Sequence, residues 1–468
     1  MAVPPEAAAA GGTRRPAGRW LAAVAAFGLL ERLALWFLYQ PAYYGDTGAY
    51  LRLAEVLSRL SLVGYDGTRV PAYPAFLAIT GPDGDAISLV QMILGWLISL
   101  LLFWIAWRTT DSPAAGVVVA LLYDLIPGQV LFEANLLTET LTTFLVVASF
   151  ALLLALARAG SGRIKAGLAS LLGLVASLAG LTRVLFFVLP VWLLPFVWWA
   201  AGDPRPQGNL STAGRLDRRL GADWQRRVLR TAVFCVGPVL LLGGWLAYIQ
   251  STYHMLSPTV MTGFNWVQHT GVFFEYLPDE EAVIRDTYLR YRDERLRERG
   301  DQTNTIWAAI PELTDVTGLS FFDLSRELQR LSLRLIRDHP DLYLLNVVEG
   351  WIAFWKAPPY WLPDNVRLAS AVPLLRFGVA AGRAVSILAN ALFLAASAAA
   401  ALSRKARRRI GWDAFAWSVA GMIWLASIVQ TLVDHGDNER FLVPLQMLVV
   451  YLVVRTLASW PRRQQAPA

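Results

Sequence analysis

The stretch Tyr43–Ile79 carries the side chains best suited to chemistry. It holds a carboxylate at Asp46, phenol groups that include Tyr50 and Tyr73, and a guanidinium at Arg69. One long apolar run precedes this stretch and another follows it, and each is long enough to cross a bilayer. The polar groups should therefore lie just outside the membrane, where an enzyme would meet the head of a lipid-linked substrate.

Asp46 has two compatible interpretations. It precedes an amphipathic segment, Thr47 to Leu60, so it is well placed to cap the start of a helix by accepting backbone N–H bonds. It is also suited to act as a general base, or to anchor a substrate hydroxyl, at the membrane surface. Burial beside lipid would raise the pKa of its carboxyl toward neutrality, as a base working near pH 7 requires.

The composition excludes an ordinary soluble protein. Of the 468 residues, 56% are hydrophobic and only 16% are charged, and 19 are Trp. Cys235 is the only cysteine, so the chain has no internal disulfide and no cysteine-based metal site. It also contains no Walker sequence and no G-x-G-x-x-G after a strand, which argues against soluble nucleotide binding. We expect no nucleic-acid partner.

Runs of about 17 to 25 apolar residues predict about ten membrane spans. They lie near residues 20 to 39, 87 to 107, 113 to 131, 137 to 157, 165 to 181, 184 to 201, 229 to 249, 374 to 402, 411 to 433 and 441 to 458. No strand alternation and no internal repeat stands out. We therefore predict an all-α polytopic membrane protein with about ten or more transmembrane helices, juxtamembrane helices and a mostly helical outer segment.

Basic residues mark the cytoplasmic side of a membrane protein, and every basic cluster falls on one face of this topology. The clusters are Arg14, Arg15 and Arg19, Arg108, Arg158 with Arg163 and Lys165, the loop from Arg205 to Arg230, Arg404 to Arg409, and Arg462 with Arg463.

The predicted regions are a disordered cytoplasmic tail (1–18), an N-terminal transmembrane module (19–250) with its first outer loop (40–86), an extracytoplasmic helical segment (251–373), and a C-terminal transmembrane module with a cytoplasmic tail (374–468).

Amphipathic patterns predict further helices outside the membrane. The apolar residues between Thr47 and Leu60 recur at helical spacing, which predicts a helix that lies on the membrane surface. The stripe Leu324, Leu328, Leu331 and Leu335 predicts a second helix of this kind. The charged segment from Asp279 to Arg299 is interpreted as a third helix. The run from Leu342 to Trp355 is too short and too polar to span, so we interpret it as an interfacial helix.

Several motifs, taken in their order along the chain, resemble those of the GT-C glycosyltransferases. The motifs are Asp46 with Tyr50 after a span containing Arg32, Arg69-Val70-Pro71-Ala72-Tyr73-Pro74, Leu137-Thr138-Glu139-Thr140, Leu181-Thr182-Arg183, Thr262-Gly263-Phe264-Asn265, His339-Pro340 and Glu439-Arg440-Phe441-Leu442-Val443-Pro444. The closest groups are the bacterial relatives of protein O-mannosyltransferases and of the lipid A aminoarabinose transferase. The resemblance covers most of the chain.

The resemblance implies an activity and a location. Such enzymes move a sugar from a polyprenyl-phosphate donor to an acceptor at the extracytoplasmic face, with inversion, and use an acidic residue of the first outer loop. By position that residue is Asp46. The resemblance also implies that the protein lies in the plasma membrane of a bacterium. The mannosyltransferases carry Asp-Glu where this chain has Asp46-Thr47, and Tyr where it has Phe441. The acceptor class therefore stays open between protein, glycan and lipid.

The leaving group of such a reaction is a lipid phosphate, so cations are expected near the outer headgroups. Arg69, Arg183, Arg376, Arg383 and Arg440 are candidates, although each could instead reach the headgroups or form a structural ion pair. For Arg376 we favour the structural interpretation. The residues expected to bind substrate are Tyr50, Arg69, Tyr73, Glu139, Arg183, Asn265, His269, Arg383 and Arg440.

Two acidic positions keep alternatives open. Glu139 could favour the start of its helix through the helix dipole, or it could point at the acceptor. Glu31 and Arg32 fall near the middle of the first span, where we expect them to neutralise each other or neighbouring helices. We interpret that pair as structural.

A metal site is a further possibility. His269 and His435, with Asp46 and Glu139, offer nitrogen and oxygen ligands, but no H-x-x-x-H or similar spacing is present. No cofactor is required by the sequence, and a divalent ion remains possible.

Two other functional classes compete with a membrane glycosyltransferase. A lipid or glycan transporter, or a flippase, would place its site at the bilayer midplane between related halves. The sequence shows no paired halves, and its polar residues gather at one face. A non-catalytic scaffold that uses the large outer segment is the third class, and the clustered outer arginines argue against it.

Overall fold

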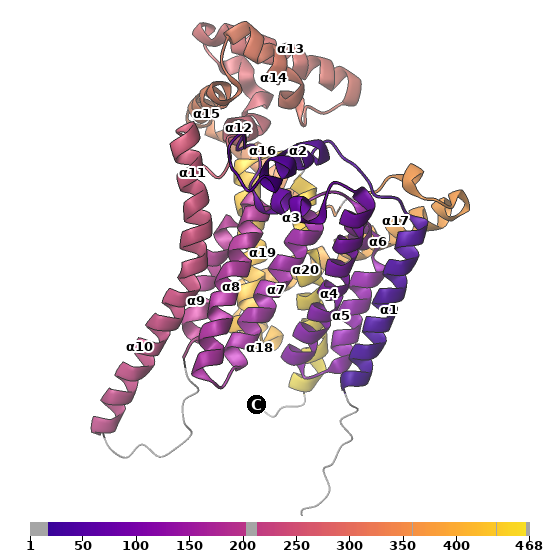
Figure 1. Ribbon diagram of the computed structural model, residues 1–468, viewed down its shortest axis with the longest axis vertical. Coiled ribbons are helices and arrows are strands. Elements are labelled where there is room, and N and C mark those ends of the chain that lie inside the picture. The colour runs from indigo at the N-terminus through magenta and orange to yellow at the C-terminus, as the bar shows by residue number, and fades with distance from the viewer. Residues whose placement is uncertain (1–16, 203–212, 358, 437, 465–468) are drawn as a thin grey trace, which may run out of the picture.

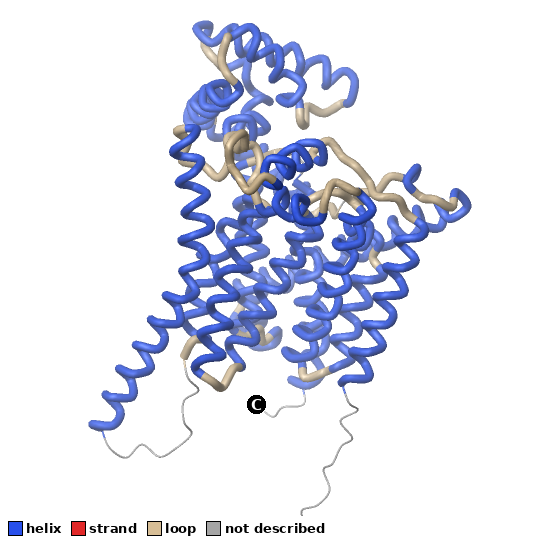
Figure 2. Tube along the Cα trace, viewed as in Figure 1, coloured by secondary structure: helices blue, strands red, loops and turns tan. Residues whose placement is uncertain are grey.

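The computed structural model describes residues 17–202, 213–357, 359–436 and 438–464 (Figure 1). Within these ranges the regular secondary structure is helical, and Figure 2 shows the helices in blue and the loops in tan. Two isolated β-bridges pair residues that lie outside the helices. The all-α prediction is therefore confirmed. The predicted cytoplasmic tail falls almost entirely outside the described residues, since the first helix already begins at Ala17.

Eight helical segments in the described part of the chain are long and apolar enough to cross a membrane. They are α1 (Ala17–Leu38), α4 (Gly84–Thr110), α7 (Glu139–Arg158), α8 (Gly162–Thr182), the segment Asp223–Tyr253 formed by α10 (Ala213–Pro238), η3 (Val239–Gly243) and α11 (Gly244–Tyr253), the segment Ala369–Leu402 with α17 (Val372–Leu402), α19 (Ala414–Val433), and the segment Asn438–Ala458 with η8 (Asn438–Leu442) and α20 (Val443–Gln464). The chain is an integral, multi-pass membrane protein.

Two of the ten predicted spans take other forms. The segment near 113 to 131 folds as α5 (Pro113–Leu125) and α6 (Pro127–Val130) with η1 (Leu131–Ala134), bent by 66°. Pro127 lacks an N–H and disfavours a helical Ile126, so the helix must break there. The segment near 184 to 201 begins with a 3₁₀ turn, η2 (Val184–Phe187), and its α-helix α9 (Val188–Ala200) has only 13 residues.

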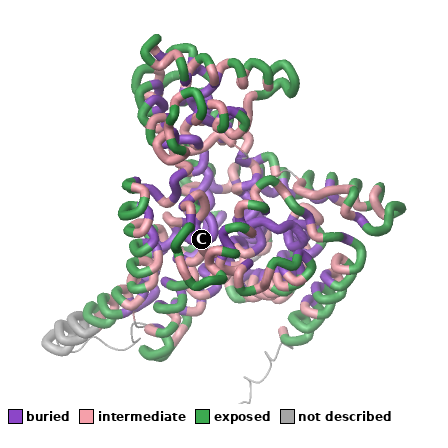
Figure 3. Tube along the Cα trace, turned by 45° about the horizontal axis from the view of Figure 1, so that its top comes forward, coloured by how far each residue is buried: buried purple, intermediate pink, exposed green. Residues whose placement is uncertain are grey.

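The starts of several helices follow from local capping. Ser112 accepts a hydrogen bond from Ala115 N, and Pro113 occupies the first turn of α5. Asp413 does the same for α19 by accepting from Ala416 N at 2.8 Å. The apolar side chains of these helices pack into one large core, and Figure 3 shows buried positions concentrated in the middle of the bundle.

A separate helical unit stands above the bundle in Figure 1. It consists of α12 (Thr262–Thr270), η4 (Gly271–Tyr276), η5 (Asp279–Glu281), α13 (Ala282–Arg299), α14 (Thr305–Thr317) and α15 (Phe321–Asp338), and α16 (Pro340–Phe354) leads back to the bundle. The leucine stripe of α15 is buried in the core of this unit. The expectation that this stripe lies on the membrane is therefore wrong, because α12 and α14 pack against α15 instead.

Gly263 allows α12 and α15 to approach closely. A Cβ at this position would lie 1.7 Å from the backbone oxygen of Ser325. We expect Gly263→Ala to lower the stability by about 1 to 3 kcal/mol because the two helices must separate. Thermal unfolding of the purified protein measures this change. Gly167→Ala is the control, since a Cβ there meets nothing within 4 Å, and equal melting of the two variants would contradict the prediction.

The first outer loop lies across the upper end of the bundle in Figure 1. It contains α2 (Thr47–Ser58) and α3 (Ala72–Thr80), which pack on each other. Ala42 forms a β-bridge with Asn135, and Tyr39 forms another with Val366. The start of the loop is thus fixed to the residues that follow η1 and to the segment before α17.

A buried charge cluster joins α1 to the bent α5–α6 pair. Arg32 donates to both carboxylate oxygens of Glu133, at 2.7 and 3.0 Å, and to Asp124 Oδ1 at 2.6 Å. It also contacts Glu31 at 2.7 Å. The side chains of Asp124 and Glu133 are fully buried. This geometry agrees with the structural interpretation of Glu31 and Arg32.

Candidate functional site

A chain of ion pairs brings five of the predicted site residues together at the upper end of the bundle. Arg69 donates to Asp46 Oδ1 at 2.7 Å, and Arg440 donates to Asp46 Oδ2 at 3.1 Å. Arg440 also contacts Glu139 Oε1, which accepts a second bond from Arg183 at 2.8 Å. We call these five residues the Asp46–Glu139 network. They come from the first outer loop, α7, the end of α8 and η8.

Asp46 occupies the position before α2, but its carboxylate makes no capping hydrogen bond. The neighbouring Thr47 fixes the turn instead, because its hydroxyl accepts from Tyr44 N and donates to Leu136 O. The carboxylate of Asp46 is thereby left to the two arginines, and its side chain stays 33% exposed. The helix-cap interpretation of Asp46 is wrong for its side chain.

Two tyrosines of the predicted site support Arg69 rather than reach outward. The guanidinium carbon of Arg69 lies 5.7 Å from the centroid of the Tyr50 ring. Tyr73 packs edge-on against Tyr50 at 5.0 Å and is fully buried, with its hydroxyl donating to Gln91 at 3.1 Å. Gln91 in turn donates to the backbone oxygens of Glu133 and Asn135. Tyr73 therefore holds Tyr50 in place from behind.

Glu139 is fully buried at the first residue of α7. Its Oε1 receives both arginines, whereas its Oε2 has no hydrogen-bond partner among the described residues. A buried carboxylate oxygen without a partner costs free energy that a bound polar group would recover. Of the two interpretations left open for Glu139, this geometry favours contact with a ligand.

Two more buried polar atoms near Glu139 lack a partner in the described part of the chain. They are the hydroxyl of Tyr44 and Oδ1 of Asn135. Both residues adjoin Tyr360: the Tyr44 ring lies 6.0 Å from its ring, and Asn135 donates to its backbone oxygen at 3.0 Å. The guanidinium of Arg440 lies 5.9 Å from the same ring. Aromatic faces beside unmet hydrogen-bonding atoms suit a ligand rich in hydroxyl groups.

The electrostatics of Asp46 differ from the sequence expectation. Burial raises the pKa of its carboxyl, but the positive charges of Arg69 and Arg440 outweigh burial, and the pKa lies below its ordinary value. The expected rise toward neutrality is therefore wrong for the ligand-free protein. Asp46 is an ionised hydrogen-bond acceptor at neutral pH.

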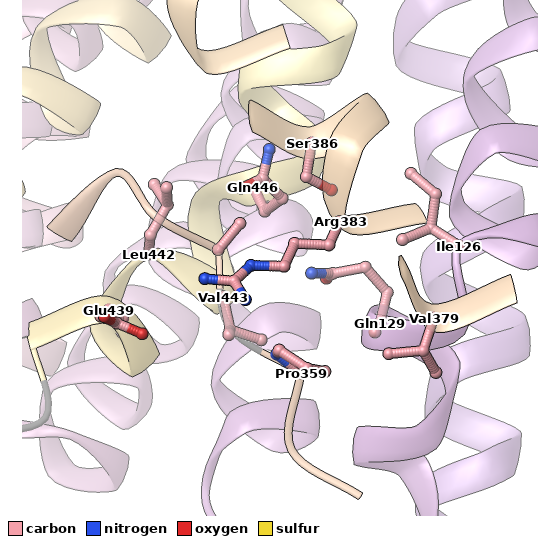
Figure 4. A pocket seen from close by; sticks show the side chains of 12 residues that line it. Ile126, Gln129, Pro359, Val379, Arg383, Ser386, Glu439, Leu442, Val443 and Gln446 are labelled. Carbon is pink, nitrogen blue, oxygen red and sulfur yellow. The ribbon is translucent and has the colours of Figure 1, made fainter. Parts of the chain in front are cut away.

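A polar cleft lies beside the network, between α6, α17, α20 and the segment before Tyr360. It has a volume of about 20 Å³, and its lining includes Arg383, Gln129, Gln446 and Glu439. Figure 4 shows the side chains of Arg383 and Gln129 extending into it. Arg383 is exposed and donates to Lys356 O at 3.2 Å, so it does not join the network. Leu442 and Glu439 line the cleft on either side of Arg440 in the sequence.

Asn265 and His269 lie outside the network. Asn265 is half-buried on α12, in the separate helical unit. His269 is fully buried on the same helix, with its ring 5.4 Å from Tyr343 and 5.5 Å from His435. Burial, together with the nearby His435, lowers the pKa of His269 to about 3. Its imidazole is therefore neutral, and both ring nitrogens are buried without a hydrogen-bond partner among the described residues. It does not contact the Asp46–Glu139 network through any described hydrogen bond or ion pair, and its role in binding substrate stays a prediction.

No metal site is assembled from the described residues, since no three or more His, Cys, Asp or Glu side chains are placed to hold an ion. Asp46 and Glu139 are joined through Arg440, whereas His269 and His435 pack on each other. The set considered for a divalent ion is therefore separated into two pairs.

Sequence reasoning missed Tyr360, Asn135 and Gln129. Tyr44 was in the stretch first singled out, but its role depends on Tyr360, more than 300 residues away. None of these residues belongs to a periodic pattern or a charged motif. Only the bend after α5 and the β-bridge at Ala42 bring Gln129 and Asn135 to the site.

We compared the whole chain with known proteins. The comparison finds no matching family model, no matching curated protein and no matching solved structure.

Proposed function

We propose that this chain is an integral membrane glycosyltransferase with a GT-C-like layout of about ten spans. It moves a sugar from a polyprenyl-phosphate donor to an acceptor hydroxyl, with inversion, at the outer face of a bacterial plasma membrane. The observation that carries the proposal is the Asp46–Glu139 network, in which a partly exposed carboxylate and three arginines meet at one end of the membrane helices. The ordered motifs that resemble the GT-C family supply the reaction type.

In the proposed reaction the acceptor oxygen attacks the anomeric carbon of the donor sugar. The new carbon–oxygen bond forms as the bond to the phosphate oxygen breaks, and the electron pair of that bond leaves with the phosphate. The acceptor proton passes to the carboxylate of Asp46. Arginine side chains stabilise the negative charge that develops on the phosphate. Tyr44, Asn135 and Glu139 offer hydrogen-bonding atoms to the sugar hydroxyls.

The arginines also explain how Asp46 becomes a base. In the ligand-free protein they hold the pKa of Asp46 low, which makes the carboxylate a weak proton acceptor. A donor phosphate competes with Asp46 for Arg440 or Arg69. Once one arginine turns to the phosphate, burial dominates and the pKa of Asp46 rises. Proton transfer is then favoured only when the donor is in place.

Arg383 is suited to meet the donor phosphate as it arrives from the membrane. A guanidinium on a membrane helix costs about 2.5 to 3.5 kcal/mol at the centre of the span and less toward its end, so a polar surrounding or an anionic ligand favours it. Arg383 has that surrounding in the cleft, beside Gln129 and Gln446. The lipid phosphate is expected to pass Arg383 on its way to Arg440.

A pH profile tests the role of Arg69. Because the pKa of Asp46 lies below its ordinary value, transfer by the wild-type protein should persist as the pH falls through the usual range of Asp. Arg69→Gln removes one positive charge while burial remains, so the pKa of Asp46 rises and the acidic limb of kcat/KM moves to higher pH. Arg59→Gln is the control, because Arg59 is exposed and pairs with the exposed Glu55 one turn earlier on α2. An unchanged acidic limb in Arg69→Gln would show that Asp46 does not set it.

The test of the function itself is a transfer assay with the purified protein in liposomes. Labelled polyprenyl-phosphate sugars are supplied with protein, glycan or lipid acceptors, and the label is followed into the acceptor by mass spectrometry. Movement of labelled lipid between leaflets without transfer would favour a flippase. Failure to bind polyprenyl phosphate at all would favour a scaffold.

A further inference from the structure

A second groove lies at the opposite end of the membrane helices from the Asp46–Glu139 network. It lies between the start of α8 and the middle of α10, around Arg226 and Arg230, and it has a volume of about 620 Å³. Since α8 runs from Gly162 to Thr182, its two ends are roughly 30 Å apart, which is the thickness of a bilayer core. In Figure 1 α10 extends beyond the neighbouring helices at this lower end.

The groove is positively charged. Arg163, Arg226 and Arg230 line it, and the lining residues in the described part of the chain include no Asp or Glu. Arg230 is buried and donates to the backbone oxygen of Ala201, which fixes one wall. Arg163 and Arg226 are exposed. Planar guanidinium groups bind phosphate oxygens in pairs, so this arrangement favours a phosphate group.

Apolar side chains border the same groove. Leu229 lines it and is 63% exposed, and Ala166 forms part of the opposite wall. Ile164 and Trp224, each within two residues of a lining arginine, are also exposed, at 57% and 60%. A soluble anion would gain no binding free energy from these apolar side chains. A lipid gains at both ends, because its phosphate meets the arginines and its acyl chains cover the apolar side chains.

We propose that this groove binds the headgroup of an anionic glycerophospholipid from the leaflet opposite the candidate active site. Basic pockets between membrane helices are typical sites for such headgroups. The bound lipid would fix α10 against α8. The proposal does not depend on the transferase activity, because neither groove residues nor α10 belong to the Asp46–Glu139 network.

Lipid titration followed by native mass spectrometry tests the proposal. The probes are phosphatidylglycerol, zwitterionic phosphatidylcholine and soluble glycerol phosphate, added to the detergent-purified protein. The wild-type protein is expected to prefer phosphatidylglycerol, and glycerol phosphate should not compete at equal concentration. Arg163→Gln with Arg226→Gln should weaken phosphatidylglycerol binding roughly 10- to 30-fold, since each arginine near a membrane surface contributes to anionic lipid binding.

The matched control is Arg404→Gln with Arg409→Gln, which removes two exposed arginines of α18 (Arg404–Ile410) at the same end of the bundle. This control should bind phosphatidylglycerol as the wild type does, and both double variants should melt as the wild type does. Equal weakening in the control would show a diffuse surface-charge effect and overturn the site. Full competition by glycerol phosphate would overturn the lipid in favour of a soluble anion.

Discussion

Asp46→Asn is expected to lower the rate of sugar transfer by about 10²- to 10⁴-fold, the usual contribution of a positioned general base. The amide keeps the size of the carboxylate and can still accept a hydrogen bond from Arg69 or Arg440, but it cannot take a proton. Because the side chain of Asp46 is partly exposed, the variant should fold and bind the donor. Initial rates in the liposome assay, donor binding and thermal unfolding are measured side by side.

Glu55→Gln is the matched control for this experiment. Glu55 also lies on the first outer loop, but its carboxylate is 71% exposed and pairs with Arg59 at 2.9 Å on the surface of α2. Its replacement should leave the transfer rate unchanged. If Asp46→Asn transfers sugar at the wild-type rate, Asp46 has no part in the chemistry. If it loses donor binding along with the rate, Asp46 orders the sugar instead of accepting the proton.

Arg32→Leu is expected to destabilise the protein by about 3 to 5 kcal/mol, because it leaves buried carboxylates without their cation. Asp124 and Glu133 are both fully buried and both receive hydrogen bonds from Arg32. Glu133 is one residue before Ala134, whose backbone oxygen accepts from Ala42 N at 2.9 Å. The loss of the cluster should therefore also loosen the first outer loop.

Thermal unfolding in detergent measures the effect of Arg32→Leu. Adding Glu133→Gln to this variant should recover part of the stability, since one unpaired carboxylate is then neutral. Arg376→Leu is the control, because Arg376 is an exposed arginine on the membrane helix α17. If Arg32→Leu unfolds at the same temperature as the wild type, the buried carboxylates do not depend on Arg32 for stability.

Much of the fold could be predicted because local patterns determine it. Apolar runs located the membrane helices, and helical spacing located α2 and α15. The partner of an apolar face cannot be deduced in this way. The leucines of α15 fit a membrane surface and a helical core equally well in sequence, and only the fold shows that they are buried in a core with α12 and α14 against α15.

The sequence predicted which residues form the candidate site better than it predicted the pKa of Asp46. Charged residues inside or beside apolar runs are costly, so Asp46, Glu139, Arg183 and Arg440 stood out by type alone. Their contacts depend on how four distant segments meet. The pKa of Asp46 then follows from a competition between burial and two arginines, and the sign of that competition depends on distances that no sequence pattern contains.

The contact between Asp46 and Arg440 spans 394 positions of the chain. At a synthesis rate of about 5 to 20 residues per second, the ribosome needs roughly 20 to 80 s to make the second partner after the first. During this interval the carboxylate of Asp46 has only Arg69 as a counterion within the network, and Glu139 awaits one of its two cations. The Asp46–Glu139 network is therefore completed only after η8 has been made, so a nascent chain stalled before η8 would lack the ion pairs of Arg440 with Asp46 and Glu139.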